Sequence, residues 1–158
     1  ELFTGGQDFQ EGEGVKTLHI DGLPPVGVLI CYEVIFPGQV TDPDNRPDWL
    51  LNITNDAWYG DSTGPRQHLL QTRVRAIEEG LPIVRSASTG ISALIDPYGR
   101  VLDKISLNER GVINSELSTK VSTPTNYSYF KEWIFTCISV ILMIVNLVLI
   151  GRFPKLKR

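Results

Sequence analysis

Residues 26–33 read VGVLICYE, and this stretch determines how the rest of the sequence is interpreted. Its first five residues are apolar or glycine, a pattern typical of a strand that is buried on both faces of a sheet. The run ends at Cys31, and a tyrosine and a glutamate follow at once. Because open α/β sheets present side chains into a crevice at the carboxyl ends of their strands, the pattern places a thiol at such a crevice.

Further apolar runs predict the other elements of this sheet. A helix is expected between Pro65, which a first helical turn tolerates, and Gly80, which favours a helix end, because apolar residues recur between them at helical spacing. The class is therefore α/β or α+β, with apolar strands that need cover on both faces. The expected strands are residues 15–20, 49–53, 82–87 and 112–117, and a hairpin of 91–95 and 101–105 around a turn at 96–99.

Residues 133–150, WIFTCISVILMIVNLVLI, form a run of 18 residues without a charge. About 20 apolar residues in a helix cross the roughly 30 Å hydrocarbon core of a bilayer. A buried core helix is the alternative, but a core helix of this length usually shows a polar face. We therefore expect a membrane-spanning helix, followed by a basic cytoplasmic tail at 152–158. By the positive-inside rule, residues before Trp133 then lie outside the cytoplasm.

The charge of the chain is uneven, which argues against nucleic acid as a partner. Four of the 15 basic side chains lie in residues 152–158, which leaves 11 basic against 18 acidic side chains in residues 1–151. An acidic body does not suit a phosphate backbone. The two cysteines and two histidines show no Cys-x-x-Cys or His-x-His spacing. We therefore expect no disulfide scaffold, no metal and no cofactor.

Cys31 is the residue whose position points to nucleophilic chemistry. A thiolate is the strongest side-chain nucleophile near neutral pH when a neighbouring base or cation lowers the thiol pKa. Where the chain bends after the strand, a backbone NH just beyond the bend can stabilise an oxyanion. The alternative is a cysteine that only packs as a hydrophobic residue. The other cysteine, Cys137, lies inside the apolar run, so we expect no disulfide between the two.

Other candidates are open to two interpretations each. His68 lies on the expected helix, either in a Cys–His dyad or, as we favour, in helix packing. The charged residues at 73–79 are expected to form a solvated ladder on that helix. Asn55 and Trp58 follow a buried strand and are expected near the same sheet edge as Cys31, with Trp58 either packing in a loop or forming a wall for an apolar substrate.

Five strings of residues carry a family resemblance. They are LICYE at 29–33, LNITNDAWYG at 51–60, GP-x-QH at 64–68, R-x-RA-x-E at 73–78 and RS-x-x-TGIS at 85–92. In this order they resemble the nitrilase (carbon–nitrogen hydrolase) superfamily. Within it, Cys-Tyr-Glu, Asn-Asp-Ala-Trp and a C-terminal membrane helix are similar to the apolipoprotein N-acyltransferases.

The resemblance implies a four-layer αββα sandwich with a Glu-Lys-Cys triad. Cys31 matches the nucleophile, and Tyr32 and Glu33 match the pair that the acyltransferases need beside it. The Glu and Lys of the family lie upstream of the cysteine, and we expect them before Glu1. We expect residues 1–126 to be the C-terminal part of the catalytic domain, 127–151 a linker and transmembrane helix, and 152–158 the tail.

The function implied by the resemblance is acyl transfer at a bacterial inner membrane, with the catalytic domain on the periplasmic face. The acyl donor is a phospholipid, the acceptor is the N-terminal S-diacylglyceryl-cysteine of an apolipoprotein, and Cys31 carries the acyl chain between them as a thioester. Asn55 and Trp58 are then expected to contact substrate. Two alternatives remain: a membrane-tethered amidase or nitrilase that uses water as acceptor, and an inactive fragment.

Overall fold

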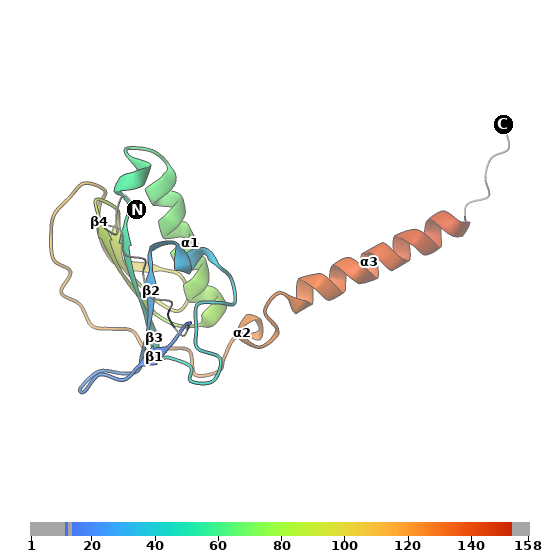
Figure 1. The fold of residues 1–158 in the computed structure, drawn as a ribbon, viewed down its shortest axis with the longest axis horizontal. Helices are drawn as coiled ribbons and strands as arrows, with labels where there is room; N and C mark the ends of the chain where they lie inside the picture. The colour runs from blue at the N-terminus through green and yellow to red at the C-terminus, as the bar shows by residue number, and fades with distance from the viewer. Residues whose placement is uncertain (1–11, 13, 153–158) are drawn as a thin grey trace.

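A computed structural model describes residue 12 and residues 14–152 of the chain, and its centre is a mixed six-stranded sheet (Figure 1). The strands lie in the sheet in the order in which they occur in the sequence. The elements, in chain order, are β1 (Thr17–Leu18), β2 (Val26–Ile30), η1 (Cys31–Ile35), β3 (Trp49–Asn55), η2 (Ala57–Tyr59), α1 (Gly64–Glu79), β4 (Ile83–Ser88), β5 (Ser92–Ile95), β6 (Val101–Ile105), α2 (Asn126–Phe130) and α3 (Trp133–Arg152).

The three central strands, β2, β3 and β4, are parallel, and the outer strands pair antiparallel with them or with each other. This confirms the expected α/β class. In the register of the central strands, Leu29 pairs with Asn52 and Asn52 pairs with Arg85. Because parallel strands end at the same edge of a sheet, the segments that follow β2, β3 and β4 meet there.

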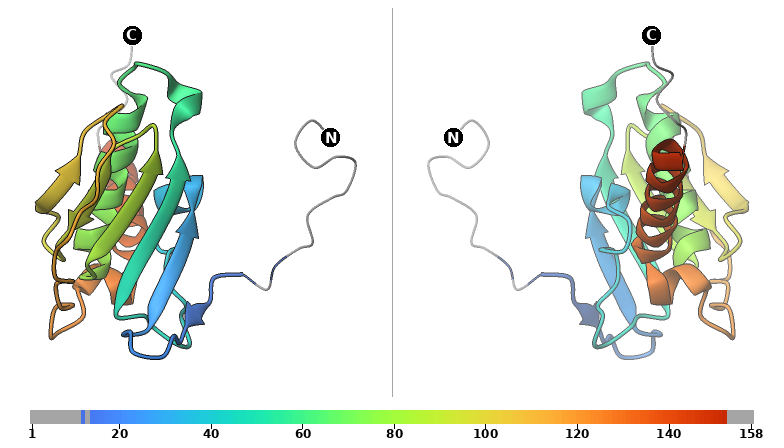
Figure 2. Two further views of the ribbon diagram at one scale, coloured as in Figure 1. Left: turned by 90° about the vertical axis from the view of Figure 1, so that its left-hand side faces the viewer. Right: turned by 90° about the vertical axis from the view of Figure 1, so that its right-hand side faces the viewer.

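Helix α1 covers one face of the sheet (Figure 2), and the core lies between them. Pro65 stands in its first turn, and Gly80 ends the helix in a left-handed conformation with φ of +63°. A side chain rarely adopts that conformation, which explains the glycine at this position. The buried core residues are Leu29, Val34, Val40, Leu50, Ala76, Leu81, Ile83, Ala93 and Ile95.

The opposite face of the sheet is apolar and largely open in the described part of the chain. Ile30 and Ile53, near the ends of β2 and β3, are 63% and 47% exposed. Val28 and Leu51 on the same face are half-buried. The described residues thus form a sheet and a helix layer, and the open face is the surface that a second sheet would cover in the expected four-layer sandwich.

Two expected strands differ in the structure. The strand expected over residues 15–20 is limited to Thr17–Leu18, and the one expected over 112–117 is not formed. In the second case the apolar residues contact the sheet without forming a strand. Ile113 and Leu117 line a cavity of about 340 Å³ with Val84 and Leu94 of the sheet, so they pack against the sheet without pairing with its edge.

Helix α3 extends away from the sheet (Figure 1), and none of the stretch Trp133–Ile150 is buried. By length and composition this helix is able to cross a membrane. Its exposure argues against the core-helix alternative, because a core helix buries its apolar side chains within the protein.

Candidate active site

Cys31 lies at the carboxyl end of β2, where the chain bends from the strand into η1. Its thiol is free and the residue is half-buried. Its backbone has φ of +53°, in the left-handed region that non-glycine residues rarely adopt. Holding such a residue there costs on the order of 1–3 kcal/mol, so the surrounding structure must stabilise the bend.

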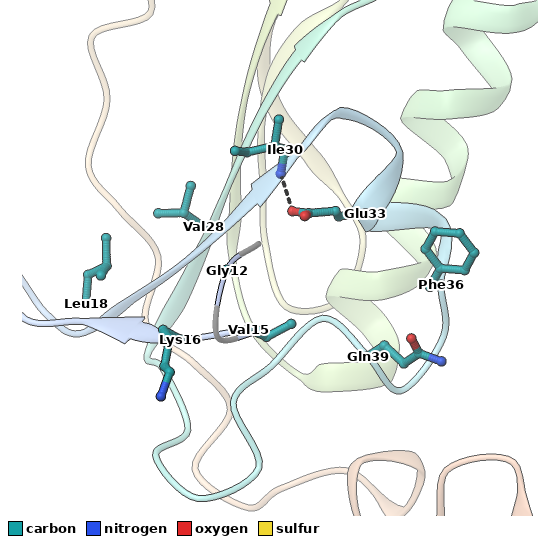
Figure 3. A pocket seen from close by; sticks show the side chains of 10 residues that line it. Gly12, Val15, Lys16, Leu18, Val28, Ile30, Glu33, Phe36 and Gln39 are labelled. Carbon is teal, nitrogen blue, oxygen red and sulfur yellow. Dashed lines mark hydrogen bonds between the residues drawn. The ribbon is translucent and has the colours of Figure 1, made fainter. Parts of the chain in front are cut away.

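Glu33 supplies one of the contacts that stabilise the bend (Figure 3). Its Oε2 accepts a hydrogen bond of 2.7 Å from the backbone NH of Ile30, the last residue of β2. The carboxylate is otherwise exposed and faces a cavity of about 510 Å³. The cavity is lined by Leu18, Val28, Ile30 and Phe36 and by the polar Lys16 and Gln39. The three residues expected at the catalytic centre, Cys31, Tyr32 and Glu33, therefore lie on one turn, but only Glu33 lines this cavity.

Asn52 supplies the second contact from β3. Its side-chain NH₂ group donates to two backbone carbonyl oxygens at the end of β2 and the start of η1, that of Leu29 at 3.2 Å and that of Cys31 at 3.4 Å. The residue is fully buried. Since buried amides are costly unless their groups are paired, its carbonyl oxygen also needs a partner.

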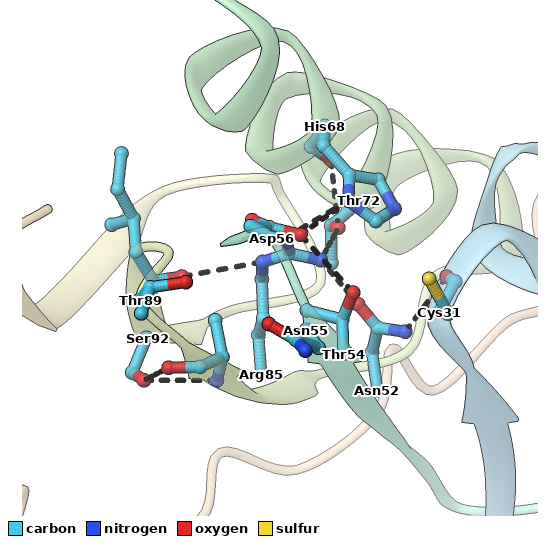
Figure 4. Close-up of polar contacts among 12 residues, drawn as sticks. Cys31, Asn52, Thr54, Asn55, Asp56, His68, Thr72, Arg85, Thr89 and Ser92 are labelled. Carbon is cyan, nitrogen blue, oxygen red and sulfur yellow. Dashed lines mark hydrogen bonds and ion pairs between the residues drawn. The ribbon is translucent and has the colours of Figure 1, made fainter. Parts of the chain in front are cut away.

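That partner is Arg85 of β4, whose guanidinium lies at the centre of a buried polar network (Figure 4). Nη1 donates to Asn52 Oδ1 and, at 3.2 Å, to Thr72 of α1. Nη2 pairs with Asp56 Oδ2 at 2.7 Å, and Nε donates to the carbonyl of Ile91 at 3.2 Å. Arg85 is 1% exposed, so the sheet buries a charge and satisfies its donors in several directions at once.

Asp56 is the anion of this network. Burial opposes ionisation of its carboxyl group, but the hydrogen bond from His68 and the charge of Arg85 outweigh it, and the pKa lies below the ordinary value of 3.8. Burial lowers the pKa of Arg85, while the charge of Asp56 acts in the opposite direction. The two side chains therefore form a buried ion pair, with Thr54 donating a further hydrogen bond of 3.1 Å to Asp56.

His68 belongs to this network. Its Nδ1 lies 2.9 Å from Asp56 Oδ1, and its ring stacks on Tyr32 with 5.5 Å between centroids. The ring of Tyr59 meets it edge-on at 6.0 Å. Among the described residues, the Nδ1 of His68 lies near Asp56 and Arg85 and not near Cys31, which favours the packing interpretation over a Cys–His dyad.

Asn55 and Trp58 lie at the same edge of the sheet, as expected. Asn55 Oδ1 accepts a hydrogen bond of 3.1 Å from the NH of Ala57 and so shapes the turn η2. The side chain of Trp58 is 71% exposed. Tyr59, the next residue, places its ring 6.2 Å from that of Tyr32 and so links this turn to the Cys31 bend.

Sequence reasoning did not identify the network of Asn52, Asp56 and Arg85. One signal for it was present, since Asn52 interrupts an apolar strand at a position that faces the core. The charged ladder on α1 also differs from expectation, because Arg75 and Glu79 are buried. Arg75 pairs with Glu78 at 2.8 Å, and Glu79 pairs with Arg46 of the loop before β3 at 2.8 Å.

The arrangement suits covalent chemistry on a thiol. In the residues that the structure describes, no group of three or more His, Cys, Asp or Glu side chains is placed to hold a metal ion. The edge of the sheet carries a half-buried thiol on a strained bend, which is held by Glu33 on one side and by Asn52 on the other.

Comparisons with known proteins identify the family of the chain. Residues 4–127 match the family model described as carbon-nitrogen hydrolase. The chain is 44% identical to the apolipoprotein N-acyltransferase of Rhodopseudomonas palustris over 146 residues, 92% of this chain and 27% of that protein. It is 52% identical to that of Bradyrhizobium diazoefficiens over 120 residues, 76% of this chain and 22% of that protein. The chain thus spans about a quarter of the length of these relatives.

Solved structures show the same fold at lower identity. An amidase from Nesterenkonia sp. superposes with a TM-score of 0.52 at 20% identity, covering 65% of this chain and 41% of the amidase. A variant of that amidase, with a TM-score of 0.51 at 21% identity over the same shares of the two chains, carries a covalently added acetamide moiety at its active-site cysteine. These matches support the fold.

Proposed function

Because the chain belongs to the carbon–nitrogen hydrolase family, we propose that it is the nucleophile-bearing, C-terminal part of an apolipoprotein N-acyltransferase. The observation that carries the proposal is the bend at Cys31, a free thiol at the carboxyl edge of three parallel strands. The choice of reaction within the family rests on relatives of that name at 44% and 52% identity. A bilayer-spanning α3 fits substrates that both reside in a membrane.

The proposed reaction has two half-reactions that share one thioester. In the first, the Cys31 thiolate attacks an ester carbonyl of a phospholipid, the ester C–O bond breaks, and the lysophospholipid leaves as an alcohol after taking up a proton. In the second, the α-amine of an S-diacylglyceryl-cysteine attacks the thioester. The C–S bond then breaks, an amide forms, the amine gives up a proton and the thiolate of Cys31 is regenerated.

The groups that move these protons are proposed to lie outside this chain. The Glu and Lys of the family precede the cysteine, and we assign neither role to Glu1, Glu11, Glu13 or Lys16. Of these, only Lys16 lies among the described residues. The open apolar face of the sheet is where we propose that an upstream half of the same domain packs. Tests of activity therefore use the full-length protein that includes this chain.

The remaining site residues have proposed roles near the thioester. Tyr32 is half-exposed beside Tyr59 and His68, a position from which its ring is able to flank the acyl group. Asn55 and Trp58 are proposed to contact substrate from the neighbouring turn, with Trp58 offering an exposed apolar surface to a lipid chain.

Glu33 is proposed to combine two roles, holding the bend through Ile30 and keeping a negative charge beside the nucleophile. Glu33→Gln retains an oxygen acceptor but removes the charge, which we propose orients the incoming amine, so we expect acyl transfer to fall by roughly 10²-fold, the scale typical of a misplaced reacting group. The melting temperature should change little, because the glutamine oxygen still accepts the bond from the strand. The measurement is the rate of transfer of a fluorescent acyl chain in the full-length protein.

Glu109→Gln is the matched control for this change. Its carboxylate also accepts a backbone NH three residues earlier, from Ser106 at 3.3 Å, but at the far end of β6. It should leave transfer unchanged. A Glu33→Gln variant with the wild-type rate would remove the proposed role of the charge.

The membrane topology is proposed to place the catalytic domain outside the cytoplasm and the C-terminus inside. The four basic residues at 152–158 resist translocation against the membrane potential, whereas Lys131 and Glu132 cancel on the other flank. Alkaline phosphatase fused after Arg158 should therefore be inactive, and green fluorescent protein at the same position should fluoresce.

A phosphatase fused after Lys120, ahead of the helix, is the control and should be active. Activity of the fusion after Arg158 would contradict the topology, and with it transfer to lipoproteins on the outer face of the membrane.

A further inference from the structure

We infer that Arg85 is a positioning residue for the nucleophile: through Asn52 it holds the backbone carbonyl of Cys31 and so fixes the bend that presents the thiol. The inference rests on the proposed function only in taking Cys31 as the reacting group. Its basis is a row of three paired positions across adjacent strands, in which the side chain of Arg85 contacts that of Asn52 and Asn52 contacts the backbone carbonyl of Leu29.

The first step runs from Asn52 to the bend. The side-chain NH₂ group of Asn52 bridges the carbonyls of Leu29 and Cys31, which stand on either side of the last residue of β2. Cys31 has φ of +53°, and without such contacts its backbone would relax toward a commoner conformation. The direction of the thiol depends on that backbone, so the bridge determines where the nucleophile points.

The second step runs from Arg85 to Asn52. An amide side chain can rotate by half a turn and exchange its donor and acceptor ends. Arg85 Nη1 donates to Oδ1 of Asn52, so only the orientation that turns the NH₂ group toward β2 is satisfied. Arg85 thereby fixes which end of the amide faces Cys31.

The third step fixes Arg85 itself. Its remaining donors bind Asp56, Thr72 and the carbonyl of Ile91, from three different segments. Asp56 is held in turn by His68 and Thr54. Gly90 allows this packing, because a Cβ there would overlap the Asp56 carboxylate. A planar fork with five donors is able to make these contacts together, and the single ammonium of a lysine is not.

Two substitutions separate positioning from folding. Asn52→Asp keeps an acceptor for Arg85 but removes the NH₂ group that donates to the carbonyls of Leu29 and Cys31. Arg85→Lys keeps the positive charge but removes the planar guanidinium with its five donors. In each, single-turnover acylation of Cys31 by a fluorescent phospholipid should fall about 10²-fold, the loss expected when a reacting group is misplaced by about 1 Å. The KM for the phospholipid should remain within about threefold of wild type, because neither residue is placed at the lipid.

Arg75→Lys is the matched control, since Arg75 is also a buried arginine but pairs with Glu78 on α1. It should lower the melting temperature as Arg85→Lys does and leave acylation unchanged. The inference is overturned if Asn52→Asp or Arg85→Lys loses acylation only in proportion to its unfolded fraction.

A second readout does not depend on lipid chemistry. The rate at which iodoacetamide alkylates Cys31, followed on its peptide by mass spectrometry in the full-length protein, should fall about tenfold in both variants and not in Arg75→Lys. If the wild type forms no thioester yet this pattern holds, the proposed function fails and the positioning role stands. If the wild type forms the thioester and both variants match it in both assays, the positioning role fails and the proposed function stands.

Discussion

Replacement of Cys31 by alanine should reduce acyl transfer by at least about 10⁴-fold, because the covalent route loses the atom that carries the acyl group. The bend would remain, since its contacts go to backbone atoms at Ile30 and Cys31 and not to the thiol. Loss of activity should therefore occur without loss of folding. The measurement is turnover of a labelled phospholipid by the full-length protein, with the melting temperature recorded beside it.

Cys137→Ser provides the control. This thiol is free as well, but it is exposed on α3, within the apolar stretch and outside the site. The variant should retain full transfer. A labelled acyl adduct that persists in Cys31→Ala would show that another residue accepts the chain and would end the assignment of Cys31.

Asp56→Asn should lower the free energy of unfolding by about 3–5 kcal/mol, the usual cost of removing one partner from a buried ion pair. Arg85 would remain buried with its charge uncompensated, and His68 would lose its charged partner. Acylation should fall as well, since Arg85 holds Asn52. The measurement is unfolding of the detergent-solubilised full-length protein. As a control, Asp48→Asn removes an exposed pair with Lys120 and should cost no more than about 1 kcal/mol.

The buried ion pair of Asp56 and Arg85 predicts a pH dependence of stability with a defined sign. The pKa of Asp56 in the folded protein lies below its ordinary value of 3.8, so its contribution to stability is fully present above that pH. It is lost as the pH falls through the lowered folded-state pKa. Wild type should therefore lose stability on acidification over this range by more than Asp56→Asn does. Equal acid sensitivity of the two proteins would contradict an ionised, paired Asp56.

Local patterns were sufficient to predict most of the fold. Strand β2 follows from an apolar run, β3 from an apolar run that only Asn52 interrupts before Ile53, and α1 from helical spacing between a proline and a glycine. The strand expected at 112–117 was wrong because apolar residues in a sequence report which side chains are covered, not which backbone groups are paired. Ile113 and Leu117 are half-buried against the sheet without a strand neighbour.

The site divides in a similar way. The bend at Cys31, Tyr32 and Glu33 was predictable, because those residues are contiguous and follow a strand. The network behind them was not, since Asn52 and Arg85 are 33 positions apart and meet only through the register of β3 and β4. The same applies to Glu79, which was expected in solvent and is covered by Arg46 from a loop 33 positions away.

The central claim is that Cys31 passes an acyl chain from a lipid to an amine. Its most direct test is a pulse and chase on the full-length protein. A phospholipid with a labelled acyl chain is supplied first, and a diacylated lipopeptide with a free N-terminal cysteine amine is added afterwards. An N-acetylated form of the lipopeptide is the control, because it has no amine to accept the chain.

We predict a hydroxylamine-sensitive label on the Cys31 peptide after the pulse, and its transfer to the free lipopeptide as an amide during the chase. With the acetylated lipopeptide the label should stay on the protein. Release of the label as free fatty acid at the same rate with either lipopeptide would identify water as the acceptor. That result would contradict the transferase account and favour a membrane-tethered hydrolase.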